Sequence, residues 1–221
     1  MGTQIPTAEL CDRFEQLYTG LVTDAMDELG YRDQTLDAGL GPLERGMRAA
    51  GVAYPAEGRT NRSVDPDEQI RRFLEMLGDA PEHSVLTVNT NDTDSSHIGE
   101  LSTIALANAG CRGAVVEGGV RDTELILEQE FPVFTQFATP EDSSPRWELL
   151  EWGAPAVVGG VRVAPGDVVV ADVDGVVVVP ESIAEDVLVA AEADRENEAA
   201  LRGALRDGAD PLEAFEEYQT F

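Results

Sequence analysis

The stretch that decides the fold runs from residue 84 to residue 122. It reads SVLTVN (84–89), TNDTDSSHIG (90–99), ELSTIALANAG (100–110), CR (111–112) and GAVVEGGVRD (113–122). The apolar runs Ser84–Val88 and Gly113–Val116 predict buried strands, and Gly99–Ala109 predicts a helix between them that Gly110 ends. A crossover of this kind makes the two strands parallel, so their C-terminal ends lie at the same sheet edge. Open α/β sheets bind ligands at that edge.

Two segments reach this edge and each opens a helix. One is Gly99-Glu100-Leu101-Ser102, and the other is Gly118-Gly119-Val120-Arg121-Asp122, in which we expect the glycine pair to form a tight turn before a helix over Arg121–Glu128. Helix N-termini offer unpaired N–H groups and a partial positive charge, which suit a carboxylate ligand. The sequence therefore predicts an anion site with Arg121, Asp122 and Glu100 around it.

Each of these residues also has a purely structural interpretation. Acidic residues such as Glu100 and Asp122 are common in first helical turns because they complement the helix dipole. Arg121 beside Asp122 is compatible with an exposed ion pair that contributes little. His97 is a catalytic candidate by residue type alone. On the residues alone both interpretations stay open.

The rest of the chain predicts one mixed α/β domain over residues 1–221, with a two-layer core and no regular doubly wound pattern. From Ala154 to Pro180 the chain is rich in β-branched residues broken by turn signals, which predicts a β-meander. The other expected elements are helices at Thr7–Tyr18, Thr23–Gly30 (capped by Thr23), Pro66–Leu77, Ser182–Leu205 (capped by Ser182) and within Asp210–Phe221, and strands at Met47–Tyr54 and Pro132–Phe134.

The composition is strongly acidic. Asp and Glu number 43 against 15 basic residues, which gives a formal net charge of −28. Long apolar runs indicate a folded chain, so we expect a carboxylate-dense surface adapted to high salt, where charges are screened to within about 3 Å at 1 M. Nucleic-acid binding needs patches of Lys and Arg, and the sequence shows no basic stripe, so we expect no nucleic-acid partner.

The chain contains no lysine, so all 15 basic residues are Arg. Schiff-base catalysis and pyridoxal phosphate chemistry use a Lys amine, and a Walker-type nucleotide site needs its Lys. We therefore expect neither pyridoxal phosphate nor a nucleotide as a cofactor. Two cysteines without a CxxC pattern indicate no disulfide framework, and two histidines cannot form a three-His zinc site. Met1–Leu10 lacks a signal-peptide pattern and no apolar run approaches about 20 residues, so we expect a cytoplasmic protein with no membrane span.

The ordered motifs resemble those of the RraA-like family over residues 20–200. The segments that carry the resemblance are Thr23–Asp27, Gly99–Leu101, Val115–Asp122, Phe131–Phe134 with Thr139-Pro140, Gly159–Val161, Pro165–Asp167 and Ala171–Pro180. The family includes aldolases of 4-hydroxy-4-methyl-2-oxoglutarate and 4-carboxy-4-hydroxy-2-oxoadipate, oxaloacetate decarboxylases and an inhibitor of a ribonuclease. The resemblance implies an α/β/β sandwich of the swivelling-domain type with a C-terminal helical extension over 182–221, and homotrimers or hexamers with active sites between subunits.

The resemblance also implies site roles. Asp122 would bind Mg²⁺ or Mn²⁺ directly, and Glu100, where many aldolases of the family have Asp, would hold a metal-bound water. Arg121 would contact the pyruvyl oxygen, and the N–H groups of Leu101 and Ser102 after Gly99 would bind the carboxylate of a 2-oxo acid. A glutamate from the neighbouring subunit would complete the site, and Glu198 aligns best with it, followed by Glu196.

The absence of lysine agrees with this chemistry. Retro-aldol cleavage and oxaloacetate decarboxylation both pass through a pyruvate enolate, which needs an electron sink. Without an imine, a metal acting as a Lewis acid is the natural sink, and Mg²⁺ commonly takes one or two carboxylates and keeps several waters. Two alternatives remain, a non-catalytic regulator that binds another protein and a lyase or hydratase for another 2-oxo acid. Specificity is expected to lie in the loops 89–96 and 138–145.

Overall fold

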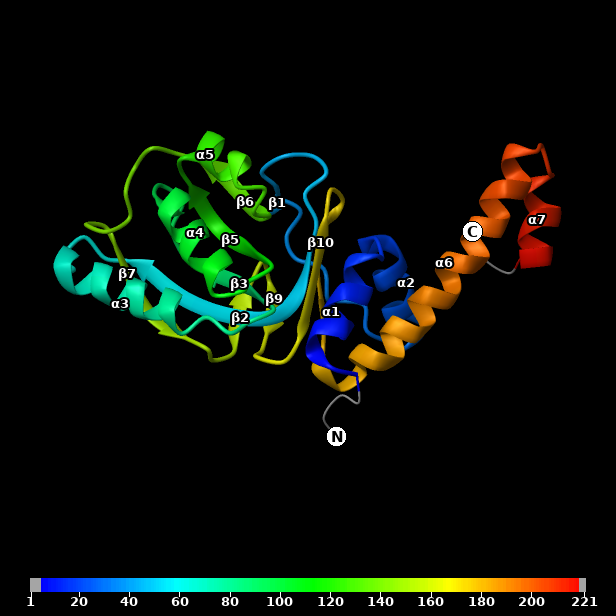
Figure 1. The fold of residues 1–221 in the computed structure, drawn as a ribbon, viewed down its shortest axis with the longest axis horizontal. Coiled ribbons are helices and arrows are strands. Elements are labelled where there is room, and N and C mark those ends of the chain that lie inside the picture. The colour runs from blue at the N-terminus through cyan, green and yellow to red at the C-terminus, as the bar shows by residue number, and fades with distance from the viewer. Residues whose placement is uncertain (1–4, 219–221) are drawn as a thin grey trace.

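The computed structural model describes residues 5–218, which fold into a mixed α/β body with a nearly closed sheet and C-terminal helices (Figure 1). The strands are β1 Gly41–Pro42, β2 Ala49–Thr60, β3 Ser84–Asn89, β4 Ser96–Ile98, β5 Gly113–Val120, β6 Val133–Ala138, β7 Trp147–Trp152, β8 Ala156–Val158, β9 Val161–Val163, β10 Val168–Asp172 and β11 Gly175–Val179. The helices are α1 Thr7–Glu15, α2 Thr19–Glu28, α3 Pro66–Gly78, α4 Glu100–Asn108, α5 Thr123–Glu128, the 3-10 turn η1 Glu181–Ile183, α6 Ala184–Arg206 and α7 Pro211–Tyr218.

Four parallel strands form the centre of the main sheet, whose order is β1-β6-β5-β3-β2-β10-β11, with β4 beside β5 and β7 beside β2. The β3-α4-β5 crossover has the predicted parallel pairing, with Val85 opposite Gly113 and Asn89 opposite Glu117. The C-terminal ends of these strands therefore share one edge, as the sequence predicts, and α4 and α5 begin there.

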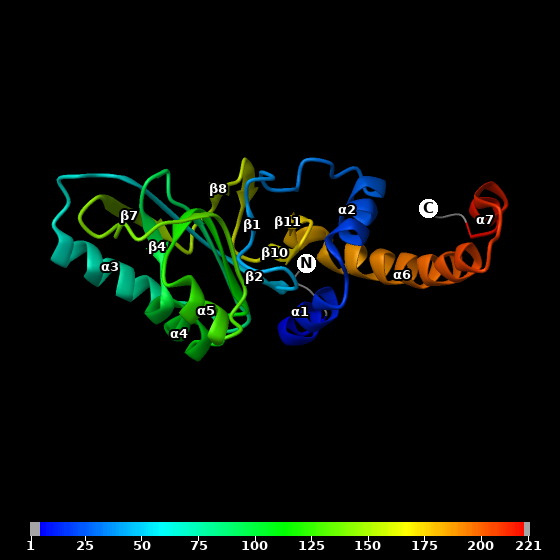
Figure 2. The ribbon, with the colours of Figure 1, turned by 90° about the horizontal axis from the view of Figure 1, so that it is seen from above.

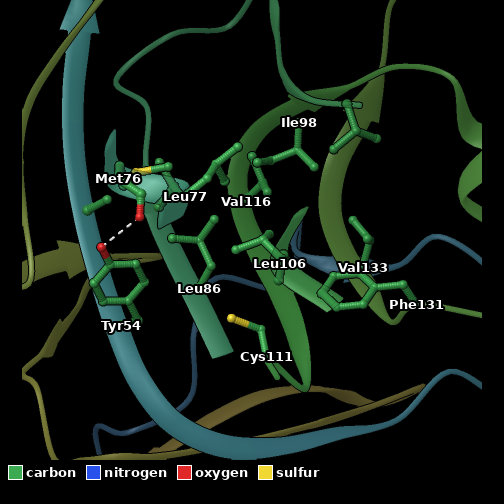
Figure 3. Close-up of a cluster of buried hydrophobic side chains, with 14 of the residues drawn as sticks. Tyr54, Met76, Leu77, Leu86, Ile98, Leu106, Cys111, Val116, Phe131 and Val133 are labelled. Carbon is green, nitrogen blue, oxygen red and sulfur yellow. Dashed lines mark hydrogen bonds between the residues drawn. The ribbon is translucent and has the colours of Figure 1, made fainter. Parts of the chain in front are cut away.

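Helices α3, α4 and α5 cover one face of the parallel strands and enclose the first hydrophobic cluster (Figure 3). Leu86 from β3 and Leu106 from α4 are fully buried within it. Complete burial of such a side chain contributes about 1.5–3 kcal/mol relative to exposure. The Tyr54 hydroxyl donates a 2.9 Å hydrogen bond to the carbonyl of Met76, so the polar end of this buried ring also has a partner.

The segment between α2 and β1 covers the opposite face of the sheet together with the β8–β9 hairpin. Leu36 N–H donates to Val176 O on β11, and Val178 N–H donates back to Gln34 O, both at 2.9 Å. A few residues later Gly41–Pro42 pairs with β6, at the other end of the strand order. One short segment thus joins both edges, and the enclosed apolar cluster includes the fully buried Phe134.

Helices α1, α2 and α6 pack on the β10–β11 hairpin and form a third cluster. The outer half of α6 extends away from the sheet body and carries α7 at its far end (Figures 1 and 2). The α6–α7 contact buries Leu201 and Ala214, which gives this arm its own small apolar interface.

Several predicted boundaries are wrong, and remote contacts explain two of them. The predicted helix Thr7–Tyr18 ends at Glu15, and α2 begins at Thr19, so Thr23 lies inside it. The buried Asp172 carboxylate accepts from both the N–H and the hydroxyl of Thr19, at 2.9 and 2.8 Å, and so caps the helix from another strand. Ser182 does not cap α6 either, because it lies inside η1, the 3-10 turn that precedes α6. The Asp167 carboxylate accepts a 3.0 Å hydrogen bond from Glu181 N–H at the start of that turn.

The glycine pair at 118–119 is the most consequential correction, because it forms no turn. Both glycines lie inside β5, at a bulge where the pairing with β6 shifts. A Cβ on Gly118, whose φ is 154°, would lie 2.5 Å from the Thr90 hydroxyl. A Cβ on Gly119 would lie 2.6 Å from the carbonyl oxygen of Ser95. The glycines therefore let the strand pass close to the 90–95 loop.

The expected start of the following helix at Arg121 is also wrong, since α5 begins at Thr123. The expected strand Met47–Tyr54 is instead the longer β2, Ala49–Thr60, and part of the predicted C-terminal helix falls on residues 219–221, outside the described range. Within residues 5–218 no helix is both long enough and apolar enough to span a bilayer.

Candidate active site

Asp122 stands where β5 ends and α5 begins, in an unusual backbone conformation. Its φ and ψ are 55° and 36°, in the left-handed region that Asp tolerates better than most residues. Its side chain does not cap α5. Instead Oδ2 accepts a 3.4 Å hydrogen bond from the Glu100 N–H at the start of α4. The conformation therefore turns the carboxylate toward the neighbouring helix, and such strained residues cluster at functional sites.

Gly99 makes room for this contact. A Cβ at position 99 would lie 2.6 Å from Asp122 Oδ2 and 3.3 Å from Arg121 Cγ. The backbone adds a further link, because Arg121 N–H donates a 3.0 Å hydrogen bond to Ile98 O. The ends of β4 and β5 are thus tied together so that the start of α4 faces Asp122.

Arg121 lies between two carboxylates. Its Nε is 3.6 Å from Asp122 Oδ2, and its Nη1 is 3.8 Å from Asp142 Oδ1. The three side chains are 41%, 41% and 45% exposed, and pairs this exposed contribute about 0–1 kcal/mol to stability. The arrangement orients the guanidinium more than it stabilises the fold.

A pocket of about 210 Å³ opens beside this group. Arg121, Asp122 and Asp142 line one part of it, and α3, the first turns of α4, strand β4 and the two serines after Asp142 line the rest. A wider, shallower depression of about 430 Å³ lies on the other side of Arg121 and Asp122, against Thr123 and the segment 138–140. The two charged side chains therefore stand between two solvent-accessible spaces, where a small ligand can reach them.

The structure brings most of the predicted site residues together. Gly99, Leu101, Ser102, Arg121 and Asp122 all line the first pocket. Ser102 N–H already donates to Gly99 O at 3.1 Å, so the Leu101 N–H is the better donor for a ligand at the start of α4. Glu100 contacts Asp122 through its backbone, and its side chain lines neither pocket.

Glu198 lies elsewhere, on the arm formed by α6. It accepts a hydrogen bond from the Tyr18 hydroxyl and pairs with Arg202 at 3.1 Å. Burial, together with the bond to Glu198, raises the pKa of Tyr18 to about 12. Glu196 is exposed on the same helix. Within one chain neither glutamate reaches Asp122, so a contribution to the site requires a second copy of the chain.

The donors at the pocket suit a hard divalent cation that keeps most of its water. Among residues 5–218 no three His, Cys, Asp or Glu side chains gather as a ready cation cage. Mg²⁺ needs no such cage, because it commonly binds through one or two carboxylates plus water. The half-exposed Asp122 carboxylate borders open space on both sides, so the residues fit an ion held mainly by Asp122.

A buried pair lies at the wall of the pocket, which His97 helps to line. The side chains of His97 and Asp92 are 1% and 4% exposed, and His97 Nε2 lies 3.3 Å from Asp92 Oδ2. Burial lowers the pKa of His97 to about 4 although Asp92 opposes the shift, so the imidazole is neutral at pH 7. Its ring meets Trp147 edge-on at 4.9 Å. The contact with Trp147 joins β4 to β7, and the pair with Asp92 joins β4 to the loop that precedes it, which agrees with a structural role for His97.

Two parts of the site were not predicted from the sequence. Asp142 lies in the loop 138–145, which was expected to affect specificity, but nothing in the sequence indicated its contact with Arg121. The α3 side of the pocket comes from a helix that precedes β3 and whose register against α4 only packing determines. The sequence predicted that this segment is a helix but did not indicate which element it packs against.

Comparison with known proteins agrees with this geometry. A family model named RraA-like and described as Aldolase/RraA matches residues 7–178. Protein DlpA of Legionella pneumophila is 28% identical over 201 residues, which are 89% of this chain and 32% of that protein. The chain therefore spans about a third of that relative's length. A protein of Halalkalibacterium halodurans named putative 4-hydroxy-4-methyl-2-oxoglutarate aldolase is 26% identical, with 92% of this chain and 91% of that one covered.

Among solved structures, Streptomyces coelicolor RraAS2 superposes with a TM-score of 0.79 at 26% identity, over 90% of this chain and 98% of that one. It is described as an unusual member of the RNase ES inhibitor RraA protein family. The similar proteins thus carry names from both the aldolase and the regulator branches, and the predicted resemblance is confirmed.

Proposed function

Because the chain belongs to the RraA-like family, we propose that it is a divalent-metal-dependent carbon–carbon lyase. It cleaves 4-hydroxy-2-oxo acids to release pyruvate and also decarboxylates oxaloacetate. The names of relatives support an aldolase at the family level. The metal dependence and the decarboxylation are our extension.

One observation carries the proposal, which is that Asp122, Arg121 and the start of α4 meet at a single pocket. A 2-oxo acid presents a carboxylate beside a carbonyl, and this site offers complementary groups for both. The Leu101 N–H lies at the positive end of α4 and suits the carboxylate. The Arg121 guanidinium suits the carbonyl oxygen, on which negative charge develops.

The chain's own residues account for orientation and charge. In the cleavage step the bond between C3 and C4 breaks and its electron pair stays on the pyruvyl fragment. Arg121 stabilises the resulting enolate charge, and Asp142 and Asp122 hold the guanidinium in place from two sides. With no lysine in the sequence, no side-chain amine forms an imine to take this charge. A Mg²⁺ or Mn²⁺ ion held by Asp122 would supply Lewis-acid stabilisation of that charge.

The proposed assembly is a homotrimer or hexamer in which Glu198 of one subunit approaches Asp122 of the next. Glu198 lies in the second half of α6, Ala184–Arg206. Figure 2 shows that this end of α6 extends away from the sheet body. That position is unsuited to a role in its own pocket and suited to one in a neighbour's. The Tyr18 hydrogen bond would hold the carboxylate at its place on the helix. Glu100 would orient a water near Asp122.

An assay for pyruvate release tests the proposal. The purified protein is incubated with oxaloacetate or 4-hydroxy-4-methyl-2-oxoglutarate, with Mg²⁺ or with EDTA. Pyruvate should form above the uncatalysed rate only with the metal, and Asp122→Asn should lower kcat/KM by at least about a hundredfold. Asp33→Asn, an exposed aspartate outside both pockets, is the control and should keep wild-type activity. No release under any condition would instead favour a protein-binding regulator.

Mixed oligomers test the shared site. Asp122→Asn and Glu198→Gln variants are purified separately, shown to fold by circular dichroism, and then co-expressed. If the two residues come from different subunits, mixed assemblies contain some sites with both native residues and regain part of the wild-type activity. If both residues act within one chain, or Glu198 has no role, mixing restores nothing beyond the average of the two variants.

A further inference from the structure

The pocket beside Arg121 changes character along its length. At one end its walls are charged, with Arg121, Asp122 and Asp142. Along α3 and α4 most of the wall is apolar, formed by Ile70, Phe73, Leu74, Leu77 and Ala105. The polar residues that also line the pocket away from the charged group carry no charge, and they are Gln69, Ser96, Ser102, Ser143, Ser144 and the neutral His97. A ligand anchored by its 2-oxo acid group at the charged end therefore meets hydrocarbon beyond it.

Cations are scarce in this pocket. Among the described residues that line it, Arg121 is the single arginine, and two carboxylates already flank it. His97 also lines the pocket, but burial lowers its pKa to about 4, so its imidazole carries no charge at pH 7. Arg146, farther along the same loop as Asp142, pairs with Glu141 at 2.9 Å and donates to the Asp142 carbonyl at 2.6 Å. A second carboxylate on a ligand would find no free basic partner here and would approach Asp142 or Asp122 instead.

The polar side chain that α3 contributes to the pocket wall is Gln69, and its oxygen is engaged. Gln69 is buried, and its side-chain oxygen accepts a 2.9 Å hydrogen bond from Leu149 N–H. Removing an ionised group from water without a partner is costly, whereas each methylene buried on an apolar wall improves binding by about fourfold. The lack of a free basic partner and the apolar wall therefore both favour a ligand whose far end is an uncharged alkyl group.

We infer that, among 4-hydroxy-2-oxo acids, the site prefers a monocarboxylic one with an uncharged alkyl chain at C4 and turns over dicarboxylic acids, such as those of the pyruvate assay, less efficiently. This inference rests on the proposed lyase function. In the reaction the C3–C4 bond breaks, its electron pair stays on C3, which takes a proton, and the C4 hydroxyl loses its proton as C4 becomes a carbonyl. The products are pyruvate and an aliphatic aldehyde.

A pair of substrates matched in shape tests the preference. In 4-hydroxy-5-methyl-2-oxohexanoate an isopropyl group occupies the position of the second carboxylate of 4-hydroxy-2-oxoglutarate. At the same salt and Mg²⁺ concentrations, the isopropyl compound should have a kcat/KM at least about tenfold higher. An equal value, or a higher value for the dicarboxylate, overturns the inference while leaving the lyase function intact.

A charge placed on the apolar wall should reverse part of this preference. Leu74 on α3 is 58% exposed, so Leu74→Arg does not disturb the core. Its kcat/KM ratio should move toward the dicarboxylate by at least about fivefold. Leu212→Arg on α7 makes the same chemical change at a 65% exposed site far from the pocket, and its ratio should stay at the wild-type value. An unchanged ratio in Leu74→Arg overturns the inference.

A binding measurement separates this inference from the proposed function. The analogues 5-methyl-2-oxohexanoate and 2-oxoglutarate lack the C4 hydroxyl, so neither undergoes retro-aldol cleavage. The first should raise the Tm of the wild-type protein more than the second at equal concentration. If the protein shows this difference in Tm but cleaves no substrate, the preference of the pocket is supported and only the proposed lyase function is wrong. Equal or greater stabilisation by 2-oxoglutarate overturns the preference.

Discussion

The Asp122 carboxylate occupies the space that a side chain on Gly99 would need, since a Cβ there would lie 2.6 Å from Oδ2. The neighbour is the end of a half-exposed side chain and not backbone, so the protein can accommodate the extra atom by moving Asp122. The backbone of Gly99 has a φ of −139°, which any residue can adopt. Glycine is therefore needed at position 99 because a side chain there would displace the Asp122 carboxylate.

Gly99→Ala should damage activity more than stability. Displacing Asp122 from Glu100 N–H should lower kcat/KM by roughly tenfold to a hundredfold, with a small change in Tm. Steady-state kinetics and thermal unfolding measure the two effects. Gly78→Ala at the end of α3 is the control, because nothing lies within 4 Å of its Cβ position. Unchanged kinetics in Gly99→Ala would show that the geometry at Asp122 is not needed.

Gly119→Ala should act in the opposite way, through stability. Its Cβ would lie 2.6 Å from both the Ser95 carbonyl oxygen and the Phe137 ring, and the backbone atom cannot move aside without shifting the loop. We expect a loss of about 1–3 kcal/mol in the free energy of unfolding, measured with urea. Gly203→Ala, in open space on α6, should instead gain about 0.5–1 kcal/mol. A neutral Gly119→Ala would mean that β5 and the loop separate easily.

These glycines show how far the sequence determines the structure. The parallel β3-α4-β5 unit was predicted because apolar runs and a helix stop lie in one continuous stretch. The meeting of Gly99 with Asp122 followed from that topology. The bulge at 118–119 was interpreted as a turn, because a pair of glycines indicates backbone freedom and not what the freedom is for. The structure explains the glycine at position 118 by the Thr90 side chain, which the fold places where a Cβ would otherwise lie.

Contacts between remote segments explain the other omissions. Strand β4 has only three residues, two of them polar, and exists because it pairs with β5. The start of α2 depends on Asp172, far along the chain. The apolar wall of the pocket depends on how α3 packs beside α4. Local patterns do not encode contacts between remote segments, so Arg121, Asp122 and the start of α4 were predicted to meet, whereas the contact of Asp142 with Arg121 and the apolar wall were not.

The buried His97 should make stability depend on pH. Burial lowers its pKa from 6.5 to about 4. Between these two values the imidazole is protonated in the unfolded chain and neutral in the folded chain. Its contribution to stability is therefore complete above pH 6.5 and is lost as the pH falls toward about 4, by up to about 3 kcal/mol. Urea unfolding at pH 7.5 and pH 4.5 should show this loss in the wild type and a smaller one in His97→Asn.

The chain's other histidine provides the control. His83 is half-buried at a φ of 63°, a conformation that Asn also adopts readily, so His83→Asn removes an imidazole without straining the backbone. Many surface carboxylates titrate in the same range, and the difference between each variant and the wild type cancels their effect. Equal slopes for His97→Asn and the wild type would exclude the buried imidazole as the cause.

The net charge of −28 should make the fold depend on salt. Repulsion between surface carboxylates reaches about 10 Å at 0.1 M ionic strength and about 3 Å at 1 M. Raising KCl from 0.1 M to 2 M should therefore raise the Tm. Sucrose at equal osmolality controls for general solute effects and should raise it less. An equal response to both solutes would remove charge screening as the explanation.

Strand β2 is divided between two partners along one of its edges. Residues 49–52 pair with β10, residues 56–60 pair with β7, and the opposite edge pairs with β3. Both partners follow β2 in the chain, β7 beginning at Trp147 and β10 at Val168, so a growing polypeptide leaving the ribosome carries this edge uncovered through about half of its synthesis. An uncovered edge can recruit other strands. The nascent chain is thus most exposed to misassembly before its β10–β11 hairpin emerges, and a chaperone that delays edge pairing would act in that interval.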